Sequence, residues 1–223
     1  MATAAPTLPR PEPVYPDSDG MPMAENTIQY RYLTLIKGGL EVVFRERADV
    51  FIAGDLFWYP VEGAPEIRTA PDVLVALGRP KADRRSYQQW REGNLPPQVV
   101  FEIASPGNRL PQMIEKFRFY DRYGVQEYYV YDPDEGELSG WQREGEQLRL
   151  IPAMQGWVSP LLGVRFELSG TELRLSGPDG RPFATYEELA EQRDRAEAQL
   201  EEQRARADRL QARLRELGLP DEA

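Results

Sequence analysis

The stretch QVVFEIA, residues 98–104, has the composition of a buried β-strand, yet it carries one acid, Glu102, among its apolar residues. Alternate residues of a strand share a face, so Glu102 lies with Val100 and Ala104, and the opposite face is apolar too. A buried carboxylate without a partner is costly and tends to take up a proton. Glu102 therefore needs a metal ion, a cation or several hydrogen bonds. A salt bridge to an arginine is the structural alternative.

The next segment, LPQMIEKFRFYDRYG (110–124), predicts a helix that ends at a glycine, with Lys116 at the border of its apolar face. The chain has only three lysines among its 27 basic residues. A lysine at this border therefore indicates that a compact ammonium group is needed there. The alternative is a surface lysine whose aliphatic stem covers apolar atoms.

A third candidate, Asp72, follows Pro71 at the start of a second apolar run, PDVLVALG (71–78). By itself it is equally typical of a turn. If the two apolar runs form neighbouring strands, Asp72 and Glu102 lie side by side and repel each other unless a divalent cation lies between them. Such a cation polarises a phosphoryl oxygen and acidifies a bound water, and a nearby lysine stabilises the developing charge. The three residues together favour phosphodiester hydrolysis.

The composition excludes several classes of chemistry. The chain contains no cysteine and no histidine, so disulfides, thiolate nucleophiles, zinc–sulfur sites and histidine-dependent hydrolysis are excluded. Oxygen-only ligation favours magnesium, calcium or manganese. The net charge of −10 argues against a broad nucleic-acid binder, but a nuclease whose metal ions supply positive charge remains compatible with it.

No run of apolar residues is long enough to span a membrane, and the N-terminus lacks the apolar core of a secretory signal. We therefore expect a cytoplasmic protein without a membrane partner. The expected organisation is a flexible proline-rich arm (1–23), a main domain (24–185), a helical tail (186–218) and a short terminal tail (219–223).

Within the main domain, residues 24–39 predict a short amphipathic helix that stops at Gly38 and Gly39, and residues 40–44 (LEVVF) predict a strand. Residues 84–93 predict a turn or short helix, and 136–151 a hairpin around Gly145. The tail shows a seven-residue repeat with complementary positions: Leu189, Ala196, Gln203, Leu210 and Leu217, with Leu200, Ala207 and Leu214. This repeat indicates a coiled coil and self-association as a homodimer, whereas the alternative is a helix packed on its own domain.

Four segments together resemble a known family: APDVLVALG, PPQVVFEIASPGN, EKFRFYDRYGVQEYYVYDP and SPLLGVRFEL. They are similar to the Uma-type restriction endonucleases, a branch of the PD-(D/E)XK nuclease superfamily, over residues 24–175. The resemblance implies an α/β, mixed α+β fold with a central mixed sheet flanked by helices. It also implies a Mg²⁺ or Mn²⁺ cofactor and hydrolysis of DNA by a metal-activated water.

The same resemblance assigns roles to the candidate residues. Asp72 and Glu102 correspond to catalytic metal ligands, and Lys116 to the catalytic lysine, moved from the strand to the helix because Ala104 occupies its usual place. Glu25 is the candidate for an assisting acid on the first helix. Members often carry an acid four residues before the helix lysine, where this chain has Gln112.

Two other functions stay open from the sequence. One is a non-enzymatic assembly module that keeps the nuclease-like fold and oligomerises through its tail. The other is a metal-dependent hydrolase of another phosphoester, such as RNA. The sequence shows no basic helix that would recognise a particular target.

Overall fold

The structure, a computed structural model, describes residues 13–18, 20, 26–105 and 110–216, without the side chains of residues 110, 214 and 215. The chain divides into two compact units, Met1–Phe183 and Ala184–Ala223. The fold is mixed α+β, as the sequence predicts. Among the described residues, no helix combines the length and apolar character that crossing a membrane requires.

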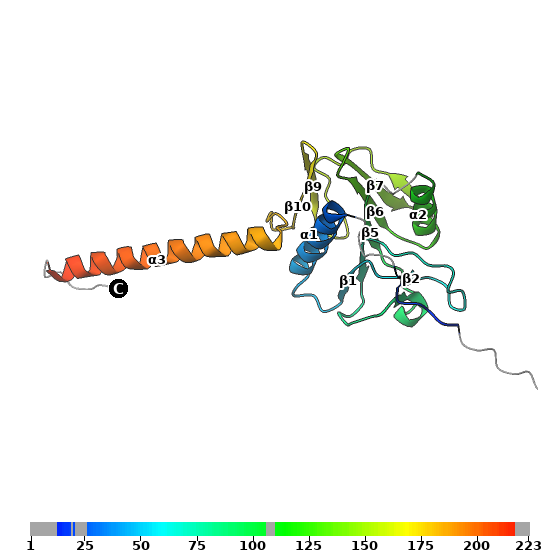
Figure 1. Cartoon of the computed structure of the whole chain (residues 1–223), viewed down its shortest axis with the longest axis horizontal. Helices are drawn as coiled ribbons and strands as arrows, with labels where there is room; N and C mark the ends of the chain where they lie inside the picture. Colours follow the sequence, from blue (N-terminus) through cyan, green and yellow to red (C-terminus); the bar gives the residue numbers. More distant parts are fainter. Residues whose placement is uncertain (1–12, 19, 21–25, 106–109, 217–223) are drawn as a thin grey trace, which may run out of the picture. The chain divides into compact units, whose positions relative to one another are not determined.

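The first unit is built around a six-stranded mixed sheet (Figure 1). Its strands, in spatial order, are β1 (Val50–Gly54), β3 (Val73–Leu77), β5 (Val99–Ile103), β6 (Glu127–Asp132), β7 (Glu137–Glu144) and β8 (Gln147–Leu150). Only β5 and β6 are parallel neighbours. Parallel neighbours need a crossover connection, and α2 (Leu110–Arg122) provides it.

The remaining elements surround this sheet or follow it. They are α1 (Thr27–Val43), β2 (Trp58–Tyr59), β4 (Tyr87–Gln88), the 3₁₀ helix η1 (Gln89–Glu92), β9 (Arg165–Ser169), β10 (Glu172–Ser176) and α3 (Tyr186–Glu216). The short strands β2 and β4 pair in parallel, and β9 and β10 form an antiparallel hairpin. The second unit contains α3.

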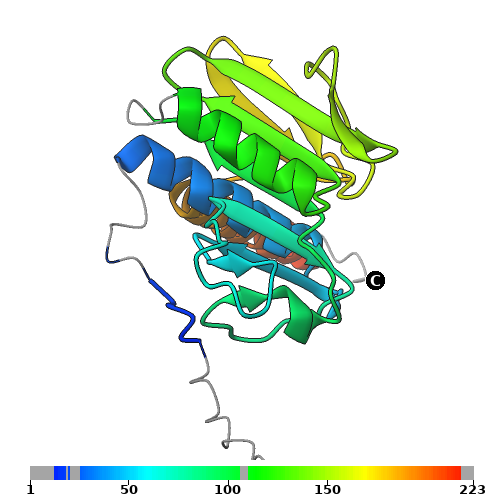
Figure 2. The same cartoon turned by 90° about the vertical axis from the view of Figure 1, so that its right-hand side faces the viewer.

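Each face of the sheet has its own apolar core. On one face, Val73 and Phe101 pack with the buried side of α1 and with β9 and β10. On the other face, Leu74 and Val100 pack with Tyr120 of α2 and with residues of β2 and β4. Figures 1 and 2 show α1 and α2 on these two sides. Because both faces are covered, the central strands are apolar on both sides, and an acid within them is enclosed.

The prediction that the first helix stops at Gly39 is wrong. Helix α1 continues to Val43, and the predicted strand 40–44 is its last turn. Leu40 is fully buried on the face that packs against the sheet, and this packing outweighs the strand preference of β-branched residues. A Cβ at Gly39 would overlap the ring of Phe183. Gly39 therefore serves close packing inside the helix.

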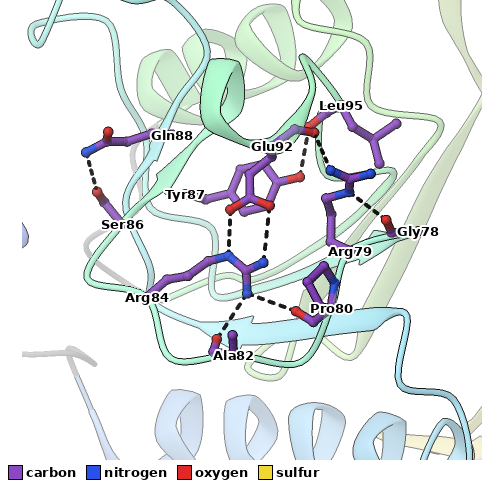
Figure 3. Close-up of polar contacts among 10 residues, drawn as sticks. All are labelled: Gly78, Arg79, Pro80, Ala82, Arg84, Ser86, Tyr87, Gln88, Glu92 and Leu95. Carbon is purple, nitrogen blue, oxygen red and sulfur yellow. Dashed lines mark hydrogen bonds and ion pairs between the residues drawn. The ribbon is translucent and has the colours of Figure 1, made fainter.

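A network of polar contacts fixes the loop between β3 and β5 (Figure 3). Arg84 forms two hydrogen bonds to the carboxylate of Glu92, at 2.7 and 3.1 Å. The Arg84 guanidinium also lies 4.0 Å from the ring centre of Phe51 in β1. The segment predicted as a turn or short helix accordingly contains the short strand β4 and the single turn η1.

Part of the predicted N-terminal arm contacts the rest of the first unit. The Tyr15 ring lies 5.2 Å from the ring of Tyr59 and 5.0 Å from that of Trp90. The Tyr59 hydroxyl donates to the carbonyl of Pro16 at 2.6 Å. Hence the described residues around Tyr15 lie against β2 and η1.

Candidate functional site

Asp72 and Glu102 face each other at one end of two neighbouring strands. Strand β3 pairs with β5 in the register Val73 to Phe101, so Asp72 is the next residue outward and lies opposite Glu102. Both side chains are buried, with exposed fractions of 7% and 4%. The structure thus brings together the two carboxylates that the sequence analysis placed on adjacent strands.

Helix α2 supplies two partners to Glu102. The Lys116 ammonium donates a hydrogen bond to Oε2 at 2.7 Å, and the Tyr120 hydroxyl donates to Oε1 at 2.5 Å. Residues four apart on a helix lie one above the other, so Lys116 and Tyr120 reach the carboxylate from the same side. Both oxygens of this enclosed acid therefore have a partner, one of them cationic.

Asp72 is held by the neighbouring strand and by α1. The backbone N–H of Ile103 donates to its Oδ2 at 2.6 Å, and the Gln29 side-chain amide donates to its Oδ1 at 3.1 Å. The same amide lies 3.5 Å from the Ile103 carbonyl oxygen. Gln29 therefore lies between two oxygen acceptors of the site.

Because Asp72 and Glu102 are both buried, little solvent screens the interaction between their charges. Burial, and then the negative charge of Glu102, raise the pKa of Asp72 to about 8, against the opposing effects of Lys116 and the Ile103 amide. Burial lowers the pKa of Lys116, but the charges of Glu102 and Asp72 outweigh burial and leave this pKa raised. Lys116 is consequently a cation at neutral pH.

A cavity of about 480 Å³ opens beside these residues. Its walls include Glu102, Lys116, Arg68, Thr69, Phe119 and Tyr128. Two of the lining side chains, Lys116 and Arg68, are cationic. Glu102 and Glu115 of the same lining are acidic, so an anionic group that enters the cavity meets positive charge at Lys116 and Arg68 alone.

The oxygen atoms of the site match the preference of a hard divalent cation. The Asp72 carboxylate and the Ile103 carbonyl lie around the Gln29 amide, with the Glu102 carboxylate on the neighbouring strand opposite Asp72, and oxygen ligands are those that magnesium and manganese prefer. Within the described part of the chain, no three or more Asp, Glu, His or Cys side chains cluster in a way that could hold a metal. The site fits a metal that takes its other ligands from water and substrate.

A comparison with known protein families shows which family the chain belongs to. A family model described as "Uma2: Putative restriction endonuclease" matches residues 20–176. The chain belongs to the Uma2 family. The matched span contains Asp72, Glu102 and Lys116, and it agrees with the resemblance noted from the four sequence segments.

One protein of known structure is also similar to this chain. The crystal structure of "a putative nuclease" from Anabaena variabilis is 16% identical, covers 69% of this chain and 84% of its own, and has a TM-score of 0.46. No curated protein matches the chain.

Of the other residues that the sequence analysis named for this Uma2 site, the structure describes Ala104 and Gln112 but not Glu25. Ala104 is buried at the cavity wall, and Lys116 reaches Glu102 from the helix instead of from the strand. Glu25 lies outside the described residues, and the side chain from α1 that contacts Asp72 is Gln29. Gln112 lines the cavity. The catalytic and ligand roles of Asp72, Glu102 and Lys116 stay predictions.

Sequence reasoning missed Gln29 and Tyr120. A signal existed for Tyr120, because it follows Lys116 by four residues on the predicted helix and so shares its face. No comparable signal pointed to Gln29, whose contact with Asp72 spans 43 residues of sequence.

Proposed function

We propose that this Uma2 protein is a divalent-metal-dependent endonuclease that hydrolyses phosphodiester bonds of DNA. The observation that carries the proposal is Glu102. It is enclosed opposite Asp72, accepts a hydrogen bond from the Lys116 ammonium, and lines a cavity that a phosphate group can enter. An acid kept only for stability has no need of a second acid, a lysine and a cavity together.

Asp72, Glu102 and the Ile103 carbonyl would hold the metal. A bound Mg²⁺ or Mn²⁺ polarises a phosphoryl oxygen and makes a water molecule more acidic. The carboxylates of Asp72 and Glu102 need a cation between them, because their mutual repulsion contributes to the raised pKa of Asp72. Gln29 would then give up its contact with one of these oxygens.

Lys116 and Tyr120 have separate tasks in this proposal. The Lys116 ammonium lies at the cavity wall, where it can stabilise the negative charge that develops on a phosphate during attack by water. The Tyr120 hydroxyl fixes the orientation of Glu102 through Oε1. Arg68, the other cation lining the cavity, is placed to bind a neighbouring phosphate of the nucleic-acid backbone.

The test combines metal binding with cleavage in matched variants. Mg²⁺ and Mn²⁺ binding are measured by titration calorimetry, with and without duplex DNA, for the wild type, Asp72→Asn and Glu102→Gln. Glu127→Gln is the control, since Glu127 is a buried acid of the next strand with no cationic partner among the described residues. Cleavage is followed on plasmid DNA, linear DNA and RNA.

We expect Asp72→Asn and Glu102→Gln each to reduce metal binding and to lower the cleavage rate at least about 100-fold, while Glu127→Gln stays within about threefold. Preference for RNA over DNA would assign the site to another phosphodiesterase. The endonuclease proposal is rejected if the wild type binds no metal even with DNA present and Asp72→Asn leaves every cleavage rate unchanged.

A further inference from the structure

Within the second unit, helix α3 carries an apolar stripe along its length. From Tyr186 to Arg213 every side chain is exposed except the half-buried Ala190. Leu189, Leu200 and Leu210 expose 49%, 48% and 58% of their surface. The helix has 31 residues, which is about 46 Å at a rise of 1.5 Å per residue. A polar helix of this length with one apolar stripe gains stability by pairing that stripe.

We propose that α3 pairs with α3 of a second copy of this chain as an antiparallel coiled coil. The seven-residue repeat supplies the stripe, with Arg193, Leu200 and Ala207 at the a positions of the heptad and Leu189 and Ala196 at d positions. The second copy is the occupant because both the apolar residues and the charges beside them match when one helix is reversed. This inference does not depend on the nuclease proposal.

In the reversed arrangement two of the four distinct core layers are wholly apolar, and the other two pair a leucine with Arg193 or Gln203. In an antiparallel pair an a residue of one helix faces a d residue of the other. In the register that we propose, the residue numbers of two facing positions add up to 403. The layers are then Leu189 with Leu214, Arg193 with Leu210, Ala196 with Ala207, and Leu200 with Gln203, each formed twice. The two alanines face each other, so the helices approach closely where the side chains are small.

The charged residues beside the stripe select this register. Glu197 and Arg204 lie at e positions, and in the 403 register Glu197 of one copy faces Arg204 of the other, twice per dimer. A shift of one heptad in one direction places Arg204 against Arg204 and Arg206 against Arg206. A shift in the other direction places Glu197 against Glu197. Both shifts bring like charges together, which is unfavourable.

A parallel pair keeps the apolar layers, since each leucine and alanine faces its own copy, but it loses the charge match. Each core residue then faces its own copy, so Arg193 would face Arg193 in the core. The flanking positions would join Gln192 with Glu197 and Gln199 with Arg204, and neither is an ion pair. The sequence of α3 therefore favours the reversed arrangement over the parallel one.

The absence of native cysteine makes the orientation directly testable in the full-length protein. Ala196→Cys and Ala207→Cys are prepared separately, one of them tagged, and oxidised alone and as a mixture. In the antiparallel register we expect each variant alone to stay uncrosslinked and the mixture to form a disulfide-linked pair. Cross-linking of either variant to itself, or a monomer in sedimentation at tens of micromolar, would overturn the proposal.

A charge exchange tests the register. Glu197→Arg places two arginines opposite each other at two points and should weaken the dimer about tenfold, and the double variant with Arg204→Glu should recover it. Glu191→Arg is the matched control. It removes the ion pair between Glu191 and Arg195, as Glu197→Arg removes the one between Glu197 and Arg193, but it lies on the outer face. Equal weakening by both single variants, or no recovery in the double variant, contradicts the register.

Discussion

Two buried glutamates on adjacent strands have different surroundings. Glu102 of β5 and Glu127 of β6 expose 4% and 1% of their surface, on opposite faces of the sheet. Glu102 has a lysine, a tyrosine and a facing aspartate, and it lines a cavity. Glu127 accepts hydrogen bonds from the Ser159 hydroxyl, the Leu161 backbone N–H at 3.0 Å and the Tyr129 hydroxyl at 2.9 Å.

The comparison shows that burial alone does not identify a functional acid. Glu127 is the more enclosed of the two, but its hydrogen-bond partners among the described residues are neutral donors that tie a loop to the sheet. Glu102 differs because a cation and a second acid lie within its reach and solvent reaches its cavity. The chemistry of the partners therefore separates a structural glutamate from a candidate catalytic one.

The largest expected effect is a pH dependence that comes from Asp72 and Glu102. In metal-free protein, with a chelator present, Asp72 keeps its proton up to a pKa of about 8, whereas in the unfolded chain its pKa is near 3.8. The folded state then binds the extra proton between these pH values. The free energy of unfolding should fall by up to about 1.4 kcal/mol per pH unit across this interval.

Denaturant unfolding at a series of pH values measures this slope. Asp72→Asn should remove it, and Glu102→Gln should confine it to lower pH, because one cause of the raised pKa is gone. Glu127 also has a raised pKa, mainly through burial, so Glu127→Gln should change the slope but preserve the fall that extends to about pH 8. A slope unchanged in Asp72→Asn would contradict the assignment.

The next prediction concerns how much Glu102 and Glu127 each contribute to the free energy of unfolding. Glu127→Ala leaves the Ser159 hydroxyl and the Leu161 N–H without their acceptor in a closed core, and we expect a loss of about 3 kcal/mol. Glu102→Ala opens toward the cavity, where solvent can hydrate the partly exposed Lys116 ammonium, so its loss should stay below about 1.5 kcal/mol. Urea unfolding at pH 7 measures both losses. A larger loss in Glu102→Ala than in Glu127→Ala would contradict this difference between the two glutamates.

The smallest effect comes from two matched tyrosines. Tyr120→Phe removes the donor to Glu102, and Tyr129→Phe removes a donor to Glu127. Each should lower the free energy of unfolding by about 1 kcal/mol for every hydrogen bond that it deletes, and Tyr129→Phe also deletes the one that its hydroxyl accepts from Trp157 Nε1. Only Tyr120→Phe should also change metal affinity and cleavage rate. Calorimetry and plasmid cleavage on both variants check this, and equal activities in the two would remove Tyr120 from the site.

Much of the fold follows from local pattern. The apolar runs that begin at Val73 and Val99 are central strands, and Gly145 lies in the predicted hairpin between β7 and β8. The last turn of α1 was missed because its formation depends on distant contacts. Phe183 packs where Gly39 has no side chain, and no local signal in residues 38–44 reveals that ring.

The residues of the candidate site also divide into those that local sequence patterns reveal and those that depend on distant contacts. Asp72, Glu102 and Lys116 stand out in the sequence because charged residues interrupt or border apolar patterns. Glu127 is also an acid of an apolar strand, at its first residue, and the sequence does not show which partners either acid has. The distinction lies in Ser159 and Leu161, which reach Glu127 across more than 30 residues.

The hydrogen bond from the Ile103 amide to Asp72 affects which residues such a protein retains during evolution. The ladder between β3 and β5 ends at Val73 and Phe101, and Pro71, which would come opposite Ile103, has no amide hydrogen. The Asp72 side chain completes the pairing there in place of backbone. If the proposed endonuclease activity were lost in a descendant, this aspartate would still be selected for folding. Its presence in a homologue therefore says little about activity, and Lys116, which lies outside the ladder, is the more informative residue to inspect.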